Sequence, residues 1–191
     1  ARHTARIYMD ADIRPGPRML GLLAQALDRP HPLYASGRLT VPPASSRISR
    51  HYARFWTRLP FVAEGVPGAG LFAVNGPGRA RWDRFPAIIS DDTYARLHFA
   101  LAERIRVAEN FTWPVVEGFP ALVAVRRRQN AGVDEIRRLF PDLLANAQDR
   151  RLTRAETLRL AAADPRGFSA YAAVALAVRL RPQGRDWTRG R

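Results

Sequence analysis

Asp10 and Asp12 are the first residues in the chain whose types and spacing suit metal chemistry. They form an Asp-x-Asp triplet directly after the apolar run Ile7-Tyr8-Met9, and the turn-forming sequence Pro15-Gly16-Pro17 follows. The run predicts a short strand, so both carboxylates are expected at its carboxyl end, where open α/β sheets bind ligands. Divalent cations of the Mg²⁺ type take one or two carboxylates and complete their shell with phosphates and water. The triplet therefore predicts a site for Mn²⁺ or Mg²⁺.

Two further charged clusters stand later in the chain. Asp91-Asp92 precedes a segment, residues 94–101, whose apolar side chains recur at helical spacing. These carboxylates either serve a site or only cap the helix, since negative charge is favoured near a helix N-terminus. Arg126-Arg127-Arg128 carries planar, permanently charged guanidinium groups that could clamp a diphosphate. In so Arg-rich a chain, the alternative for this triplet is a solvated surface.

The composition limits the classes of function without selecting one. The chain has 191 residues, 47% of them hydrophobic, which indicates a folded protein with room for one domain and a small extension. Its 31 basic residues, all Arg, against 17 acidic residues give a net charge of +14. That charge attracts phosphate groups of any kind, and a codon bias explains it equally well. Cysteine is absent, which excludes disulfides and zinc–thiolate sites.

Hydrophobic periodicity and turn residues predict an α/β fold, a mixed sheet flanked by helices. We expect residues 1–145 to form the main domain and residues 146–191 to form a helical extension with a basic tail. Residues 104–125 read as several short β-prone runs separated by Pro114, Gly118 and Pro120, and Thr153 with Glu156 forms a capping box. The predicted strands are 7–9, 33–41 (interrupted at Gly37) and 71–74; the predicted helices are 18–29, 48–59, 91–101, 134–144, 153–164 and 168–178.

The order of the motifs resembles the family 2 glycosyltransferases. Asp-Ala-Asp is followed by Gly-Ala-Gly-Leu-Phe-Ala from Gly68, by Phe85-Pro86, by Ser-Asp-Asp-Thr-Tyr from Ser90, and by Arg-Arg-Arg-Gln-Asn-Ala-Gly from Arg126. The resemblance covers roughly residues 5–140 and implies part of a GT-A-like fold. Strand–helix units that hold the nucleotide base in that family have no counterpart here. We therefore expect the chain to be an acceptor-side portion, weakly active or inactive by itself.

The resemblance also implies residue roles and partners. Asp12 would bind Mn²⁺ or Mg²⁺, and Asp10 would lie near the metal or the ribose of a nucleoside-diphosphate sugar. Asp92 would be the general base that removes a proton from the acceptor hydroxyl, with Asp91 as its acidic neighbour. The guanidinium groups of Arg126 and Arg128 would stabilise the diphosphate, and the loop with Gly68 and Gly70 would face a carbohydrate or lipid-linked acceptor. The sugar would be transferred with inversion, in the cytoplasm or at the cytoplasmic face of the membrane.

One departure from the family limits the expected reaction. Some members carry Gln-x-x-Arg-Trp before a glycine, whereas here Val125 replaces the leading Gln and Gln129 replaces the Trp. The sequence therefore gives no support for processive polymer synthesis.

Two other classes of function remain open at this stage. The charge of +14 and the Arg residues interleaved with Tyr52, Phe55 and Trp56 fit a basic nucleic-acid-binding module. No recognised nucleic-acid motif is present, so we expect no nucleic-acid partner. Residues 168–181 could instead lie at the surface of an anionic membrane. Metal-dependent nucleotide binding would favour the enzyme, and steep salt dependence of oligonucleotide binding would favour the nucleic-acid module.

Overall fold

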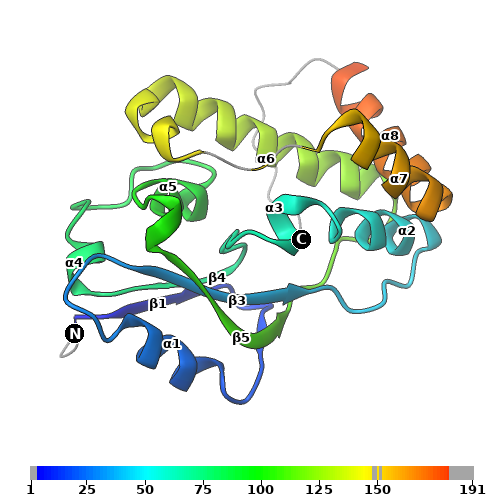
Figure 1. Cartoon of the computed structure of the whole chain (residues 1–191). Coiled ribbons are helices and arrows are strands. Elements are labelled where there is room, and N and C mark those ends of the chain that lie inside the picture. Colours follow the sequence, from blue (N-terminus) through cyan, green and yellow to red (C-terminus); the bar gives the residue numbers. More distant parts are fainter. Residues whose placement is uncertain (1–3, 148–149, 151, 181–191) are drawn as a thin grey trace.

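The computed structural model describes residues 4–147, 150 and 152–180, and these form a mixed α/β fold (Figure 1). The predicted α/β class is thereby confirmed. The strands are β1 (Arg6–Met9), β2 (Arg14–Pro15), β3 (Tyr34–Thr40), β4 (Leu71–Val74) and β5 (Arg104–Thr112). The α-helices are α1 (Met19–Leu27), α2 (Arg47–Trp56), α3 (Pro60–Ala63), α4 (Gly76–Arg79), α5 (Asp91–Leu97), α6 (Phe119–Leu139), α7 (Arg154–Ala163) and α8 (Pro165–Leu180), with 3₁₀ turns η1 (Leu101–Glu103) and η2 (Pro141–Asn146).

The five strands form one sheet in the order β1-β4-β3-β5-β2. β4 is antiparallel to both β1 and β3, while β3 is parallel to β5. It follows that β1, β3 and β5 all run in the same direction. Because Ile7 and Ala35 both pair with Ala73, Met9 at the end of β1 is level with Gly37, and β3 and β5 continue beyond it. Asp10, Val41 and Trp113, the residues that follow these three strands, therefore lie toward the same end of the sheet, with Asp10 set back from the other two.

Alternate residues of the strands supply two separate cores, as the pleat requires. Ala35, Leu71 and Ala73 pack on one face with the buried side of α1. Tyr34, Phe72 and Val74 point to the other face, where they meet α5 and Ile136 of α6. Figure 1 shows α1 on one side of the sheet and the other long helices on the opposite side.

The second predicted strand, β3, continues through Gly37 instead of being interrupted there. Its register against β5 nevertheless shifts between Ser36 and Arg38. A Cβ atom at Gly37 would lie 2.8 Å from the backbone oxygen of Glu109 and would collide with the methyl group of Met19. The glycine therefore lets α1 sit directly on the strand.

The predicted elements between residues 104 and 144 are wrong in their boundaries. A single strand, β5, replaces the expected short runs, and α6 begins at Phe119 and ends at Leu139 instead of spanning 134–144. Gly118 has φ +89° and Pro120 stands in the first turn, where the missing proline N–H leaves no helical hydrogen bond unmade. The three arginines from Arg126 consequently lie in the middle of a long helix.

Helix α6 is fixed against the segment that leads into α5. Gly132 faces Ser90 so closely that an added Cβ would lie 2.0 Å from the Ser90 hydroxyl oxygen and 2.9 Å from its Cβ. One turn later, the Glu135 carboxylate accepts a hydrogen bond of 2.9 Å from the backbone N–H of Ile89. These two contacts set how far α6 stands from the start of α5.

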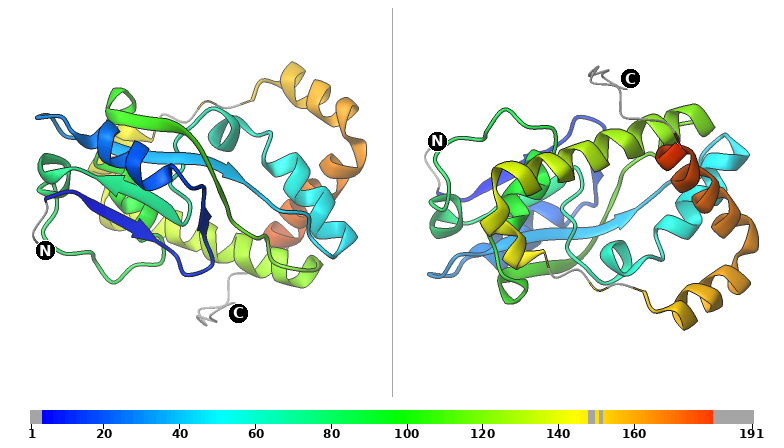
Figure 2. Two further views of the ribbon diagram at one scale, coloured as in Figure 1. Left: turned by 90° about the horizontal axis from the view of Figure 1, so that it is seen from below. Right: turned by 90° about the horizontal axis from the view of Figure 1, so that it is seen from above.

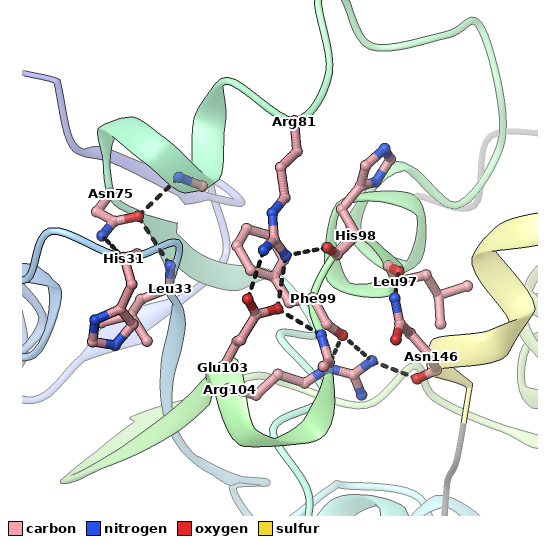
Figure 3. A network of polar contacts seen from close by, with 12 residues as sticks. His31, Leu33, Asn75, Arg81, Leu97, His98, Phe99, Glu103, Arg104 and Asn146 are labelled. Atoms are coloured by element: carbon pink, nitrogen blue, oxygen red, sulfur yellow. Dashed lines mark hydrogen bonds and ion pairs between the residues drawn. The ribbon is translucent and has the colours of Figure 1, made fainter.

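A polar network holds the opposite end of α5 (Figure 3). Arg81 donates to both carboxylate oxygens of Glu103 at 2.6 and 2.7 Å. Asn146 donates to the carbonyl of Leu97 at 2.9 Å, and its own carbonyl accepts from Arg104 at 2.6 Å. Since these bonds join the C-terminal end of α5 to β5 and η2, they hold that end of the helix and do not involve its first turn.

The C-terminal helices join the main body instead of standing apart from it. Ala170 and Val174 of α8 share a core with Tyr52 of α2 and with Leu122 of α6 (Figure 2). Asp164, which is buried, pairs with Arg54 and accepts the Gly167 N–H at 3.0 Å. The predicted capping box before α7 is confirmed, and the helix predicted over residues 168–178 corresponds to α8, in which only Gly167, Ala170 and Val174 are buried. The basic tail, residues 181–191, lies outside the described residues.

Within the described part of the chain, no helix combines the length and the apolar character needed to cross a membrane.

The contact between α6 and Ser90 predicts opposite effects for two Gly→Ala substitutions in helices. Gly132→Ala should destabilise the fold by about 1 kcal/mol or more, because the methyl group must displace Ser90 and Ile89. Gly21→Ala in α1 should stabilise it by about 0.5–1 kcal/mol, since nothing lies within 4 Å of the new methyl group. Urea unfolding of both variants checks this. Equal shifts of the same sign would contradict the proposed close packing.

Candidate functional site

Asp10 is held at the carboxyl end of β1 by the glycine-rich loop that precedes β4. Its backbone N–H donates a hydrogen bond of 2.8 Å to the carbonyl of Gly70. Gly70 has φ +72°, and a Cβ there would lie 3.2 Å from a carboxylate oxygen of Asp10 and 2.8 Å from Ile13. The glycine thus adopts a conformation that other residues avoid, and it leaves room beside the carboxylate.

Gly68, the second loop residue predicted to face an acceptor, closes over a buried phenol instead of lining an open surface. It has φ +67°, and an added Cβ would collide with the hydroxyl group of Tyr34. Burial raises the pKa of Tyr34, and the charge of Asp92 raises it further. Among the described residues, the Tyr34 hydroxyl has no hydrogen-bond partner. Gly68 therefore covers the buried Tyr34 side chain and does not line the site.

Asp91 and Asp92 occupy the first turn of α5 as predicted, but the two carboxylates differ in their surroundings. Asp91 is exposed and accepts the Asp92 N–H at 2.9 Å. Asp92 is half-buried and accepts the Thr93 N–H at 2.6 Å. Ser90 stands at the N-cap position without a capping hydrogen bond from its side chain. The acidic pair takes over part of the capping role, which agrees with the structural alternative considered from sequence.

The charges of three distant chain segments meet at Asp10. Burial raises the pKa of the Asp10 carboxyl, and the negative charges of Asp12 and Asp91 raise it further. The guanidinium of Arg128 acts in the opposite direction. Because the interaction of charges falls off with distance and screening, these groups must lie near one another. The structure therefore brings together Asp10, Asp12, Asp91 and Arg128.

Asp92 is less exposed than Asp10, Asp12 and Asp91. Burial is the largest cause that raises the pKa of its carboxyl, and Asp91 adds to it, while the Thr93 N–H and the charge of Arg96 lower it. The charge of Asp92 acts on Tyr34, and the charge of Arg96 acts on Asp92. Nothing in the sequence linked either residue to Asp92, because they approach it only through the packing of β3 under α5.

Arg126 lies apart from Arg128. Its guanidinium donates to the Tyr171 hydroxyl at 3.3 Å and stands 5.6 Å from the centre of that ring. On a helix, positions two residues apart point to nearly opposite sides. The two arginines predicted to share one diphosphate therefore serve different parts of the molecule.

His98, which follows Asp92 by one to two turns, is a packing residue. Its ring lies 4.6 Å from that of Tyr94 and 5.2 Å from that of Trp82, measured between ring centres. Burial lowers the pKa of its imidazole. These contacts direct the ring into the aromatic core and away from the acidic cluster.

The carboxylates of the acidic cluster have the chemistry of cation ligands, but they do not form a metal site by themselves. Among the described residues, no three His, Asp or Glu side chains are grouped so that they could hold a metal ion. Asp10, Asp12 and Asp91 carry the hard oxygen atoms that Mg²⁺-type cations prefer. Burial raises the pKa of the Asp10 carboxyl and the like charges of Asp12 and Asp91 raise it further, so a nearby positive charge would favour its ionised form.

Comparison of the chain with protein-family models gave no match, and a search among curated proteins found no similar protein.

Removal of single charges should move the Asp10 pKa in directions set by this geometry. Arg128→Gln should raise it, because an opposite charge is lost, and Asp91→Asn should lower it, because a like charge is lost. Carboxyl carbon chemical shifts followed by NMR across pH 2–8 measure both effects. Arg126→Gln is the matched control and should leave the Asp10 titration unchanged. A shift with Arg126→Gln as large as that with Arg128→Gln would contradict the arrangement.

Proposed function

We propose that the chain is the catalytic, acceptor-side part of a metal-dependent inverting glycosyltransferase, which moves a sugar from a nucleoside-diphosphate donor to an acceptor hydroxyl. The observation that carries this proposal is the meeting of Asp10, Asp12 and Asp91 with Arg128 at the carboxyl edge of the sheet. Residues from three separate motifs of the resembled family converge there. A cation held by these carboxylates beside the Arg128 guanidinium would suit a diphosphate, whose negative charge both would offset.

The donor end of the reaction would be handled by Asp10, Asp12 and Arg128. Asp12 and Asp10 would hold Mn²⁺ or Mg²⁺, which when bound withdraws negative charge from the departing diphosphate. Arg128 would add a guanidinium hydrogen bond to a phosphate oxygen. Stabilisation of charge that grows on a leaving group is usually the largest contribution to catalysis at such sites.

The acceptor end would be handled by Asp92. As the acceptor oxygen forms a bond to the anomeric carbon, the bond from that carbon to the phosphate oxygen breaks, and the hydroxyl proton passes to the Asp92 carboxylate. Burial raises the pKa of Asp92, which makes its carboxylate a stronger base than an exposed one. The N-terminus of α5 would steady the charge of the pair.

Metal-dependent nucleotide binding is the first test of this proposal. Isothermal titration with nucleoside diphosphates should show weak binding in Mn²⁺ and loss of binding in EDTA. Asp12→Asn should weaken the Mn²⁺-dependent affinity by about tenfold or more, since removal of a charged partner costs about 1.5–3 kcal/mol. Asp134→Asn, at an exposed carboxylate of α6, is the control of equal charge change and should bind as the wild type does. Nucleotide binding that persists in EDTA would contradict the proposal.

Turnover separates the roles of the two acidic residues of α5. In the gene product that contains this chain, Asp92→Asn should lower the transfer rate by about 10²-fold or more and leave donor affinity unchanged. The wild-type rate should fall as the pH drops through the raised pKa of Asp92, because only the carboxylate form accepts a proton. Thermal unfolding of the variant controls for stability. An Asp92→Asn enzyme that keeps more than about half its rate, with Asp91→Asn inactive, would contradict the assignment of the base.

A further inference from the structure

An apolar pocket lies between α2, the first half of α6 and residues 113–116. Trp56, Trp113, Val115 and Val125 form much of its wall. Pockets for small molecules typically have mostly apolar walls and a few polar groups that orient the ligand. The lining here follows that pattern, with Arg126 as the charged member.

Arg126 meets no negative charge in this pocket. Its guanidinium contacts the ring and hydroxyl of Tyr171, and its charge also acts on the hydroxyl of Tyr52. Within the part of the chain that the structure describes, no carboxylate forms an ion pair with it, whereas Arg54 and Arg81 each pair with one. A half-buried cation on an apolar wall is complementary to an anion that carries an apolar chain.

The pocket and the acidic cluster flank the same turn of α6. Gln129 lines the pocket and is the neighbour of Arg128, whose charge acts on Asp10. Val41 and Trp113 also line it, and they follow β3 and β5, which run in the same direction as β1 and extend beyond its end. Pocket and cluster therefore lie on different sides of α6.

We propose that this pocket binds the apolar chain of an amphiphilic anion, whose phosphate or carboxylate pairs with Arg126. That this anion is the sugar acceptor rests on the proposed function, whereas the binding of the anion to the pocket does not depend on it. The guanidinium would fix the headgroup at the mouth of the pocket while the chain lies against Trp56 and Trp113.

The test uses octyl phosphate, at concentrations below those at which it forms micelles, and the intrinsic fluorescence of the tryptophans. We expect a saturable change in wild-type protein and a loss of affinity of about tenfold or more in Arg126→Gln, which removes a charge-assisted hydrogen bond. Val125→Phe fills the pocket and should abolish binding. Ala124→Phe, at the exposed neighbouring position, and Arg138→Gln, at an exposed position near the end of α6, are the matched controls and should bind as the wild type does.

Further ligands distinguish the possible sources of affinity. Inorganic phosphate should not saturate the signal, and octanol should bind at least tenfold more weakly than octyl phosphate. Equal affinity for octanol and octyl phosphate would overturn the role of Arg126. Attraction to anionic vesicles that survives both Arg126→Gln and Val125→Phe, without binding of octyl phosphate, would overturn the pocket in favour of general surface charge. Either result would leave Mn²⁺-dependent nucleotide binding intact, so failure here is separable from failure of the proposed function.

Discussion

The contact between Gly132 and Ser90 determines where the long helix α6 stands. Because no side chain separates the two residues, α6 approaches the start of α5 far more closely than a larger residue would allow. Glu135 then ties the helix to the backbone of Ile89. Arg128 lies one turn before Gly132 on the same side, so the same contact directs its guanidinium toward Asp91 and Asp10.

Strand direction brings distant parts of the chain toward one end of the sheet. β1, β3 and β5 are far apart in sequence, yet they run the same way, because β4 is antiparallel to both β1 and β3, and β3 is parallel to β5. Asp10 follows β1, whereas Val41 and Trp113 of the apolar pocket follow β3 and β5. The two features therefore lie toward the same end of the sheet, at different distances along it.

Sequence reasoning succeeded where local rules decide the structure. The apolar run before Asp10, the helix of α1 and the capping box of Thr153 and Glu156 depend on neighbours within a few residues. It failed for residues 119–133, because Pro120 was taken as a break, although proline in the first turn starts a helix. The same error hid that Arg126 and Arg128 point to different sides. Tyr34 beneath Asp92 could not be foreseen either, since only tertiary packing joins them.

The pKa of Asp10 distinguishes the acidic cluster from carboxylates that are tied into the fold. Glu103 and Asp164 accept hydrogen bonds from Arg81 and Arg54, which lower the pKa of each. The pKa of Glu109 is lowered first by the backbone N–H of Asn110 and then by Arg18. Asp10 forms no ion pair among the described residues, and burial together with the charges of Asp12 and Asp91 raises its pKa. Because perturbed carboxylates of this kind cluster at functional sites, the surroundings of Asp10 suit the binding of a positive charge better than they suit the stability of the fold.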